Sequence, residues 1–96
     1  MRKIEEILSI CERINKEEDF SVNVVKTAFS TTIILTDENG SYEEVIVIER
    51  ESYLRVDGES VYQEPERVHI VSECVDHTEL TFKQFHANFT DNWRKI

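Results

Sequence analysis

The sequence has few of the residues that make flexible linkers, and it has no long apolar run. Two glycines and one proline leave little room for a linker, so we expect residues 1–96 to fold as a single domain. No apolar run approaches the roughly 18 residues that a membrane-spanning helix requires. The N-terminus, MRKIEEILSICERINKEE, lacks the apolar block of a secretory signal. We therefore expect a cytoplasmic protein.

Basic residues are scarce relative to acidic ones. The chain has 11 Lys and Arg against 20 Asp and Glu, a net charge of −9. Residues 37–79 hold 13 acidic and 3 basic residues, a net −10, so the rest of the chain sums to +1. Nucleic acids and anionic lipids attract basic surfaces, so we expect neither as a direct partner. The charge favours a basic partner protein; the alternative is that it serves only solubility.

The chain has two cysteines, Cys11 and Cys74. In a cytoplasmic protein both are expected to be free thiols, and their apolar neighbours predict that both are buried. Cys74 and His77 have the spacing of a metal-binding pair, but a structural zinc site needs four ligands. The other histidines, His69 and His86, have no partner at ligand spacing in the sequence. We expect no metal and no other cofactor.

Signatures of catalysis are also lacking. The sequence contains no glycine-rich phosphate loop and no Gly-x-Ser-x-Gly motif. Carboxylates are so numerous that no single pair is marked as a general acid and base. We therefore expect a protein that is not an enzyme and has no catalytic residues.

Apolar residues at helical spacing predict an amphipathic helix at each end of the chain. In residues 2–18, one face carries Ile4, Ile7, Leu8, Cys11 and Ile14. Near the C-terminus, Thr81 and Gln84 fit a capping box, and an apolar stripe then contains Phe82, Phe85, Phe89, Trp93 and Ile96. Arg94 and Lys95 would lie at the negative end of this helix's dipole.

Between the helices, alternating and β-branched runs predict strands. They cover residues 20–27, 31–36, 42–49, 53–56, 59–62 and 67–75. The third run contains Val45-Ile46-Val47-Ile48, which predicts a central strand covered on both faces.

Two dipeptides predict hairpin turns. Asn39-Gly40 and Asp57-Gly58 both suit turns with positive φ angles. A two-residue turn at Asp57-Gly58 would place Leu54 opposite Val61, Tyr53 opposite Tyr62 and Val56 opposite Glu59.

Together these patterns predict an α+β fold. We expect a mostly antiparallel sheet of about five to six strands with two hairpins, flanked by the N-terminal and C-terminal amphipathic helices. The two helices could share one face of the sheet or take one face each.

Acidic residues concentrate around the predicted hairpins. If both turns lay at the same end of the sheet, their carboxylates would resemble an array of phosphates. The alternative is that these charges protect the sheet against edge-to-edge aggregation. The candidate partner-binding residues are Asp37, Glu38, Asn39, Glu43, Glu44, Asp57, Glu59, Glu64 and Glu66.

Several of these features occur together in a known family. The short N-terminal helix, Asp19-Phe20-Ser21-Val22 opening a strand, the Asn39-Gly40 hairpin and the Phe85, Phe89 and Trp93 spacing resemble the small acidic phage anti-CRISPR proteins of type II-A systems. The resemblance covers about half of the chain and extends to Asp37, Glu38, Asn39 and Glu43. It differs at residues 52–75, which have no counterpart in the simplest family pattern, and at the basic end Trp93-Arg94-Lys95-Ile96.

The resemblance implies a function. Such proteins use no cofactor and block an RNA-guided DNA nuclease by mimicking DNA with acidic side chains. We therefore expect a phage-encoded, non-enzymatic inhibitor of a CRISPR effector nuclease or another basic nucleic-acid-handling protein. The alternatives are an immunity protein or antitoxin that neutralises a toxin, and a small homodimeric interaction module.

Overall fold

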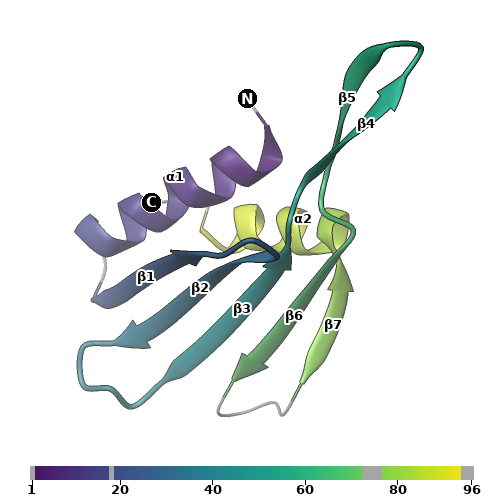
Figure 1. Cartoon of the computed structure of the whole chain (residues 1–96). Helices are drawn as coiled ribbons and strands as arrows, with labels where there is room; N and C mark the ends of the chain where they lie inside the picture. Colours follow the sequence, from purple (N-terminus) through teal and green to yellow (C-terminus); the bar gives the residue numbers. More distant parts are fainter. Residues whose placement is uncertain (1, 18, 73–76, 94–96) are drawn as a thin grey trace.

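A computed structural model describes residues 2–17, 19–72 and 77–93 of the chain (Figure 1). Along these residues, one helix precedes seven strands and a second helix follows them. The elements are α1 (Lys3–Glu17), β1 (Phe20–Lys26), β2 (Ser30–Asp37), β3 (Glu43–Glu49), β4 (Ser52–Val56), β5 (Glu59–Gln63), β6 (Arg67–Ser72), β7 (Thr78–Thr81) and α2 (Phe82–Asn92).

Five strands form one antiparallel sheet in the order β1-β2-β3-β6-β7. This arrangement confirms the predicted α+β class and the central position of β3. β7 was not predicted, because Thr78–Thr81 is short and contains a single strongly apolar residue, Leu80. Pairing with β6 makes it a strand, with His69 opposite Glu79. Cys74, whose burial was predicted, lies outside the described residues.

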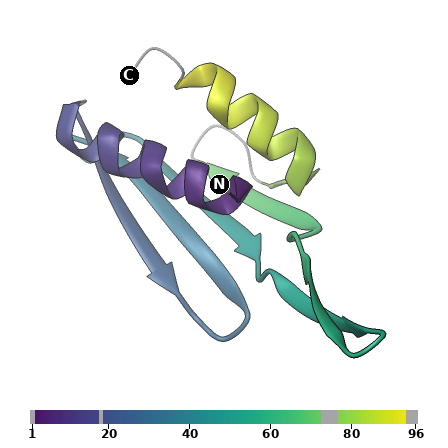
Figure 2. The same ribbon diagram turned by 90° about the horizontal axis from the view of Figure 1, so that it is seen from above.

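Both helices pack on the same face of the sheet (Figures 1 and 2). Their apolar stripes pack against the strand side chains that point toward the helices. Together these side chains form one hydrophobic layer. The buried core consists of Ile4, Ile7, Ile10, Cys11, Ile14, Ile33, Leu35, Ile46, Ile48, Val68, Phe82, Phe85 and Phe89. The spacing of the stripes identified most of these residues, but Ile10 was not among those predicted.

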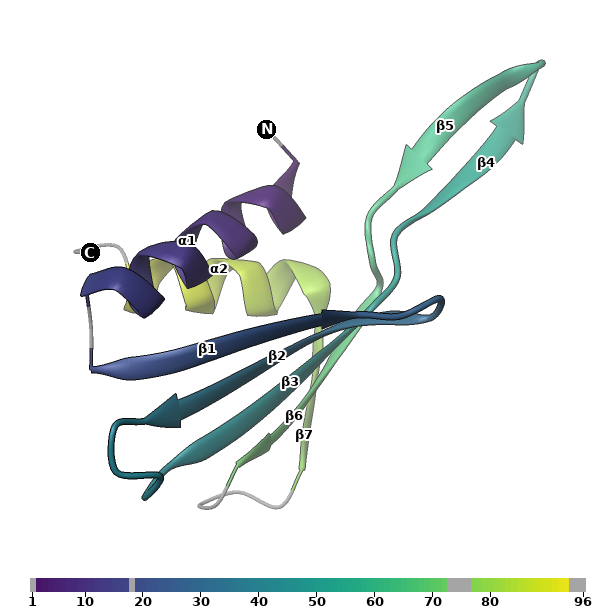
Figure 3. The same cartoon turned by 60° about the vertical axis from the view of Figure 1, so that its left-hand side comes forward.

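Neither of the two described helices covers the other face of the sheet (Figure 3). The prediction that β3 is covered on both faces is therefore wrong. Ile46 and Ile48 are fully buried under the helices, whereas Val45 and Val47 are only half-buried on the opposite side. Their β-branched side chains suit a strand whether or not a second layer covers it. We call this uncovered surface the open face.

The predicted capping box of α2 is confirmed. The Thr81 hydroxyl accepts from the Gln84 backbone N–H at 3.1 Å, and Gln84 Oε1 accepts from the Thr81 N–H at 3.2 Å. Phe82, Phe85 and Phe89 are buried and Trp93 is half-buried. The predicted positions of Arg94, Lys95 and Ile96 lie outside the described residues.

Strands β4 and β5 form a separate two-stranded hairpin that projects from the sheet (Figure 3). We call it the arm. Its register is the predicted one, with Leu54 opposite Val61 and Tyr53 opposite Tyr62. Asp57 and Gly58 have φ angles of 50° and 81°, as a tight two-residue turn requires. The arm lengthens the molecule, whose principal extents are 52 × 27 × 23 Å.

Arg2 ties the base of the arm to the start of α1. Its Nη1 donates to Glu51 at 3.1 Å and to the Tyr53 hydroxyl at 3.5 Å, and its guanidinium lies 5.3 Å from the centre of the Tyr62 ring. The hydrogen bond between Arg2 and Glu5 raises the pKa of Arg2 and lowers that of Glu5. Burial of its hydroxyl raises the pKa of Tyr62, and the neighbouring Glu51 carboxylate adds to the rise.

The turn between β2 and β3 differs in part from the expectation that Asn39-Gly40 supplies positive φ angles. Only Gly40 has a positive φ, of 70°, and Asn39 does not. The Gly40 N–H donates to the Asp37 carbonyl at 3.1 Å, and the Asp37 N–H donates to the Tyr42 carbonyl at 3.2 Å. The loop therefore needs one left-handed residue, Gly40, instead of two.

Candidate functional site

The two acidic turns lie at opposite ends of the sheet (Figures 1 and 3). The β2–β3 turn joins the end at which Thr36 pairs with Glu43, whereas the arm departs beyond the end at which Ser30 pairs with Glu49. At about 3.4 Å per residue, the seven residues of β3 span roughly 24 Å and the five residues of each arm strand about 17 Å. The condition under which the carboxylates of both turns would form one array, a common end of the sheet, is therefore not met, because the arm leaves the sheet and extends the long axis of the molecule.

One end of the sheet nevertheless collects carboxylates from three segments. Phe20 at the start of β1 pairs with Asp37, so Asp19 lies beside the β2–β3 turn. Glu38 lies in the turn itself, and Glu43 and Glu44 begin β3. We call these residues, Asp19, Asp37, Glu38, Glu43 and Glu44, the acidic end. The set of candidate residues chosen from the sequence omitted Asp19, although its place directly before a predicted strand was a signal that could have found it.

Asp37 has a structural role at the acidic end. Its carboxylate accepts from the backbone N–H of Asn39 at 3.1 Å and from that of Ser41 at 2.6 Å. Hydrogen bonds of this kind to nearby backbone groups stabilise turns. Asp37 and Asn39 therefore shape the loop that carries Glu38.

Asp19, Glu38 and Glu43 have exposed side chains, and within the described ranges none of the three forms an ion pair. Carboxylates at the base of the arm differ, because Glu51 pairs with Arg2 at 3.1 Å and Glu64 with Lys3 at 3.8 Å. The acidic end thus keeps negative charge that its own chain does not neutralise, judged over the residues that the structure describes.

The remaining candidates belong to the arm and its base. Asp57 and Glu59 lie at its exposed tip, and Glu66 is exposed directly before β6. The backbone of Glu66 has a structural role, since its carbonyl accepts from the Phe82 N–H at 2.9 Å. These carboxylates form a second acidic surface, separate from the acidic end.

A hollow of about 580 Å³ opens beside the acidic end, between α2 and the sheet. Aromatic rings line it: Phe20 contacts Tyr42 edge to face at 6.4 Å between ring centres, and Trp93 at 5.9 Å. Glu44 also lines it, and accepts a hydrogen bond from the Tyr42 hydroxyl at 2.5 Å. A half-buried carboxylate among aromatic rings suits a planar cationic group.

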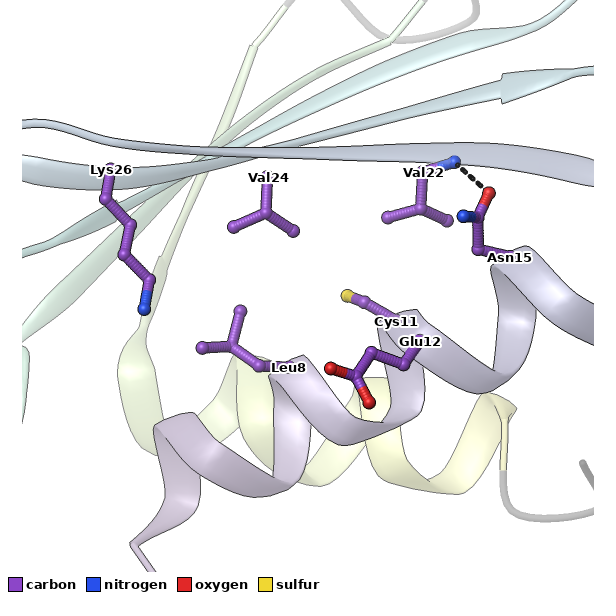
Figure 4. A pocket seen from close by; sticks show the side chains of 7 residues that line it. All are labelled: Leu8, Cys11, Glu12, Asn15, Val22, Val24 and Lys26. Atoms are coloured by element: carbon purple, nitrogen blue, oxygen red, sulfur yellow. Dashed lines mark hydrogen bonds between the residues drawn. The ribbon is translucent and has the colours of Figure 1, made fainter.

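A second hollow, of about 490 Å³, lies between α1 and β1 (Figure 4). Leu8, Cys11, Val22 and Val24 form its apolar part, and Glu12 and Lys26 add charged groups. Asn15 Oδ1 accepts from the Val22 N–H at 3.2 Å and so satisfies one backbone group of this edge strand. Burial raises the pKa of Cys11 to about 12, which keeps the thiol protonated and unreactive.

Two histidines meet on the open face, although their spacing in the sequence does not mark them as a pair. His69 Nδ1 lies 3.3 Å from His77 Nε2, and the two rings stack. His69 Nε2 lies 3.7 Å from Glu49. Antiparallel pairing brings β7 beside β6, which local spacing could not reveal. Among the described residues, no group of three or more His, Cys, Asp or Glu side chains could hold a metal ion.

Cys11 should be inaccessible to thiol reagents in the folded protein. In a Cys74→Ser background, we expect a disulfide reagent to react with Cys11 only after denaturation. The pKa of Cys11 in the folded protein, about 12, exceeds the usual value near 8.5. The contribution of the protonated thiol to the free energy of unfolding is therefore complete below about pH 8.5 and is lost as the pH rises toward 12. Fast reaction of the native protein at neutral pH would contradict this burial.

The scan against family models, the search of curated proteins and the search of solved structures each found no match to this chain. No helix among the described residues is long and apolar enough to cross a membrane.

Proposed function

We propose that this protein is a non-enzymatic, phage-encoded inhibitor that binds a basic nucleic-acid-handling protein through its acidic end. The expected target is a CRISPR effector nuclease, whose recognition of DNA would be blocked by mimicry. The observation that carries the proposal is the exposed charge of Asp19, Glu38 and Glu43 beside the sheet, which forms no ion pair with any residue that the structure describes.

The spacing of these groups supports mimicry. Neighbouring strands are about 4.8 Å apart, and successive residues on one face of a strand about 7 Å. Carboxylates on the ends of adjacent strands are therefore separated by several ångströms, as phosphates are. A nuclease that reads a short DNA motif with arginines presents a cationic pocket. Each arginine can hold a carboxylate with two parallel hydrogen bonds.

The hollow beside the acidic end supports the same partner. Phe20 and Trp93 offer aromatic surface, and Glu44 offers a carboxylate. An arginine side chain entering it would contact both. The residues that dominate binding energy at interfaces are typically anchors of this kind, buried in a well-packed pocket.

Competition with DNA tests the proposal. We expect the protein to bind at least one member of a panel of RNA-guided nucleases, and to fail to bind the same enzyme once it holds its target DNA. The reason is that both ligands require the same cationic surface. Binding measured by surface plasmon resonance should weaken as salt rises, because the contacts are between charges.

The DNA-loaded enzyme is its own control. Equal affinity for free and DNA-loaded nuclease would rule out mimicry, even if the protein proved to be an inhibitor by another route. Direct binding of DNA by the protein itself would also contradict the proposal, since a net charge of −9 repels a duplex.

An immunity protein or antitoxin would use the same acidic surface against a basic toxin. Failure to bind any nuclease of the panel, together with a toxin gene beside the coding sequence, would favour that function. The third candidate, a homodimeric module, would use a different surface, made of the open face and the arm.

A further inference from the structure

The pairing of β1 with β2 determines which backbone groups of this edge strand point away from the sheet. The Thr27 N–H donates to the Ser30 carbonyl at 2.9 Å, so the backbone groups of Thr27 face β2. Hydrogen-bonded and non-bonded residue pairs alternate along an antiparallel ladder. The N–H and carbonyl groups of Val22, Val24 and Lys26 therefore point outward, along the free edge of the five-stranded sheet.

Most of these outward groups lack a partner. Asn15 Oδ1 accepts from the Val22 N–H at 3.2 Å. Within the ranges that the structure describes, the N–H and carbonyl groups of Val24 and Lys26 form no hydrogen bond. An edge of this kind is a template for a further strand, and a charged side chain such as Lys26 discourages indiscriminate pairing. The edge therefore favours a segment that matches its charge.

The hollow between α1 and β1 lies beside the free groups (Figure 4). Val24, which is 39% exposed, and the half-buried Leu8 form its apolar middle. Lys26 lies at one end and Glu12 toward the other (Figure 4). Both charged side chains are exposed, and neither forms an ion pair in the part of the chain that the structure describes. The hollow thus offers an apolar surface between two opposite charges.

We propose that an extended segment of a partner protein pairs with β1 as a sixth strand and places alternate side chains in this hollow. In strand addition of this kind, main-chain hydrogen bonds supply affinity and pockets for alternate side chains supply specificity. Every pair in the five-stranded sheet is antiparallel, and antiparallel pairing is slightly more stable per residue than parallel pairing. The added segment therefore runs antiparallel to β1.

The lining of the hollow defines the sequence of the segment. An apolar residue opposite Val24 would contact Leu8. In an antiparallel register, the residue two positions earlier lies opposite Lys26, and the residue two positions later lies opposite Val22, toward Glu12 (Figure 4). Charge complementarity therefore selects an acidic, an apolar and a basic residue, in this order, at alternate positions. Such a segment has no net charge, so the excess negative charge of the protein neither attracts nor repels it.

Two peptides of identical composition test the proposal. Acetyl-Thr-Glu-Thr-Leu-Thr-Lys-Thr-amide has the expected order, and acetyl-Thr-Lys-Thr-Leu-Thr-Glu-Thr-amide has its charges exchanged. We expect the first peptide to slow hydrogen exchange of the Val24 and Lys26 amides, measured by NMR, because these N–H groups become bonded. The Val25 amide, which faces β2, is the internal reference. The charge-exchanged peptide should bind about five- to tenfold more weakly, because two modest ion pairs become repulsive.

A third peptide tests the backbone contact by itself. Methylation of the leucine nitrogen in the first peptide removes the N–H that would donate to the Val24 carbonyl, and leaves all side chains unchanged. We expect this peptide to leave the exchange of the Val24 amide unaltered. If it bound as well as its parent, the contact would not be strand addition.

Glu12→Lys/Lys26→Glu exchanges the two charges of the hollow and keeps the net charge of the protein at −9. Both positions are exposed, so the fold should tolerate the change. We expect this variant to prefer the charge-exchanged peptide, a reversal that loss of structure could not produce. Val25→Thr is the matched control. Its side chain lies on the opposite face of β1, so it should keep the preference of the wild-type protein.

Three results would each overturn the proposal: no slowing of exchange by the first peptide, equal binding of the two charged peptides, or a preference that the double variant does not reverse. A second copy of the chain is the other possible occupant of the edge. Slow exchange of the Val24 and Lys26 amides without peptide, in a protein that sediments as a dimer, would assign the edge to that copy and would also overturn the proposal.

The outcome is independent of the proposed inhibitor function. Reversing the charge of Asp19, Glu38 and Glu43 should leave the peptide preference unchanged, because none of them lines the hollow. A protein that binds the first peptide but no nuclease would leave this inference standing and remove the inhibitor function. A protein that competes with DNA but binds no peptide would do the reverse.

Discussion

Phe89→Ala is expected to lower the free energy of unfolding by about 3 to 5 kcal/mol, the usual cost of removing a buried phenylalanine ring. Phe89 is 5% exposed, and its ring centre lies 5.3 Å from that of Phe85 and 6.5 Å from that of Trp93. The cavity would open where α2 covers the sheet. Because a domain of this size has a total stability of about 5 to 15 kcal/mol, the variant should unfold at a much lower denaturant concentration.

Lys83→Ala is the control for this experiment. Lys83 lies on the same helix with an exposed side chain, and substitutions at such positions usually change stability by less than about 0.5 kcal/mol. Urea unfolding followed by circular dichroism gives both values. A loss below about 1 kcal/mol for Phe89→Ala would mean that the stripe of α2 is not packed in the core.

Charge reversal at the acidic end is expected to have the largest effect on binding. Replacing Asp19, Glu38 and Glu43 by lysine changes the net charge by +6, from −9 to −3. Steering by charge raises association rates by about 10- to 1,000-fold, so the triple variant should associate with a basic partner at least about tenfold more slowly at low salt. Dissociation should change less if steering is the main loss. Stopped-flow association at two salt concentrations measures the effect.

A second triple variant separates local charge from total charge. Glu59→Lys, Glu64→Lys and Glu66→Lys also give a net charge of −3, but they change the arm and its base. Exposed pairs such as Glu64 with Lys3 contribute at most about 1 kcal/mol, so the fold should tolerate the change. Equal slowing by both variants would show that total charge, and not the acidic end, controls association.

Local patterns in the sequence determined the elements of this protein. Spacings of three and four residues identified both helices, because each helix must bury one continuous stripe. Thr81 and Gln84 fixed the start of α2 through hydrogen bonds between neighbours in the chain. Asp57-Gly58 fixed the register of the arm, because a two-residue turn permits only one pairing.

The sequence predicted less where the structure of a segment depends on contacts with residues far away in the chain. β7 has few apolar residues and becomes a strand by pairing with β6. His69 and His77 meet for the same reason. Asp19 joins the acidic end because β1 pairs with β2, a contact that spans a turn. None of these contacts produces a regular spacing of residues in the sequence.

The sequence by itself determined the α+β class and the excess of negative charge, since each follows from local spacing or composition. Only the tertiary structure decided that both helices cover one face and that the arm leaves the sheet. A β-branched strand has the same sequence whether its second face is covered or open, and an acidic turn has the same sequence at either end of a sheet. The division of the carboxylates into two separate surfaces therefore depends on strand order, which is set by long-range pairing and not by any local pattern.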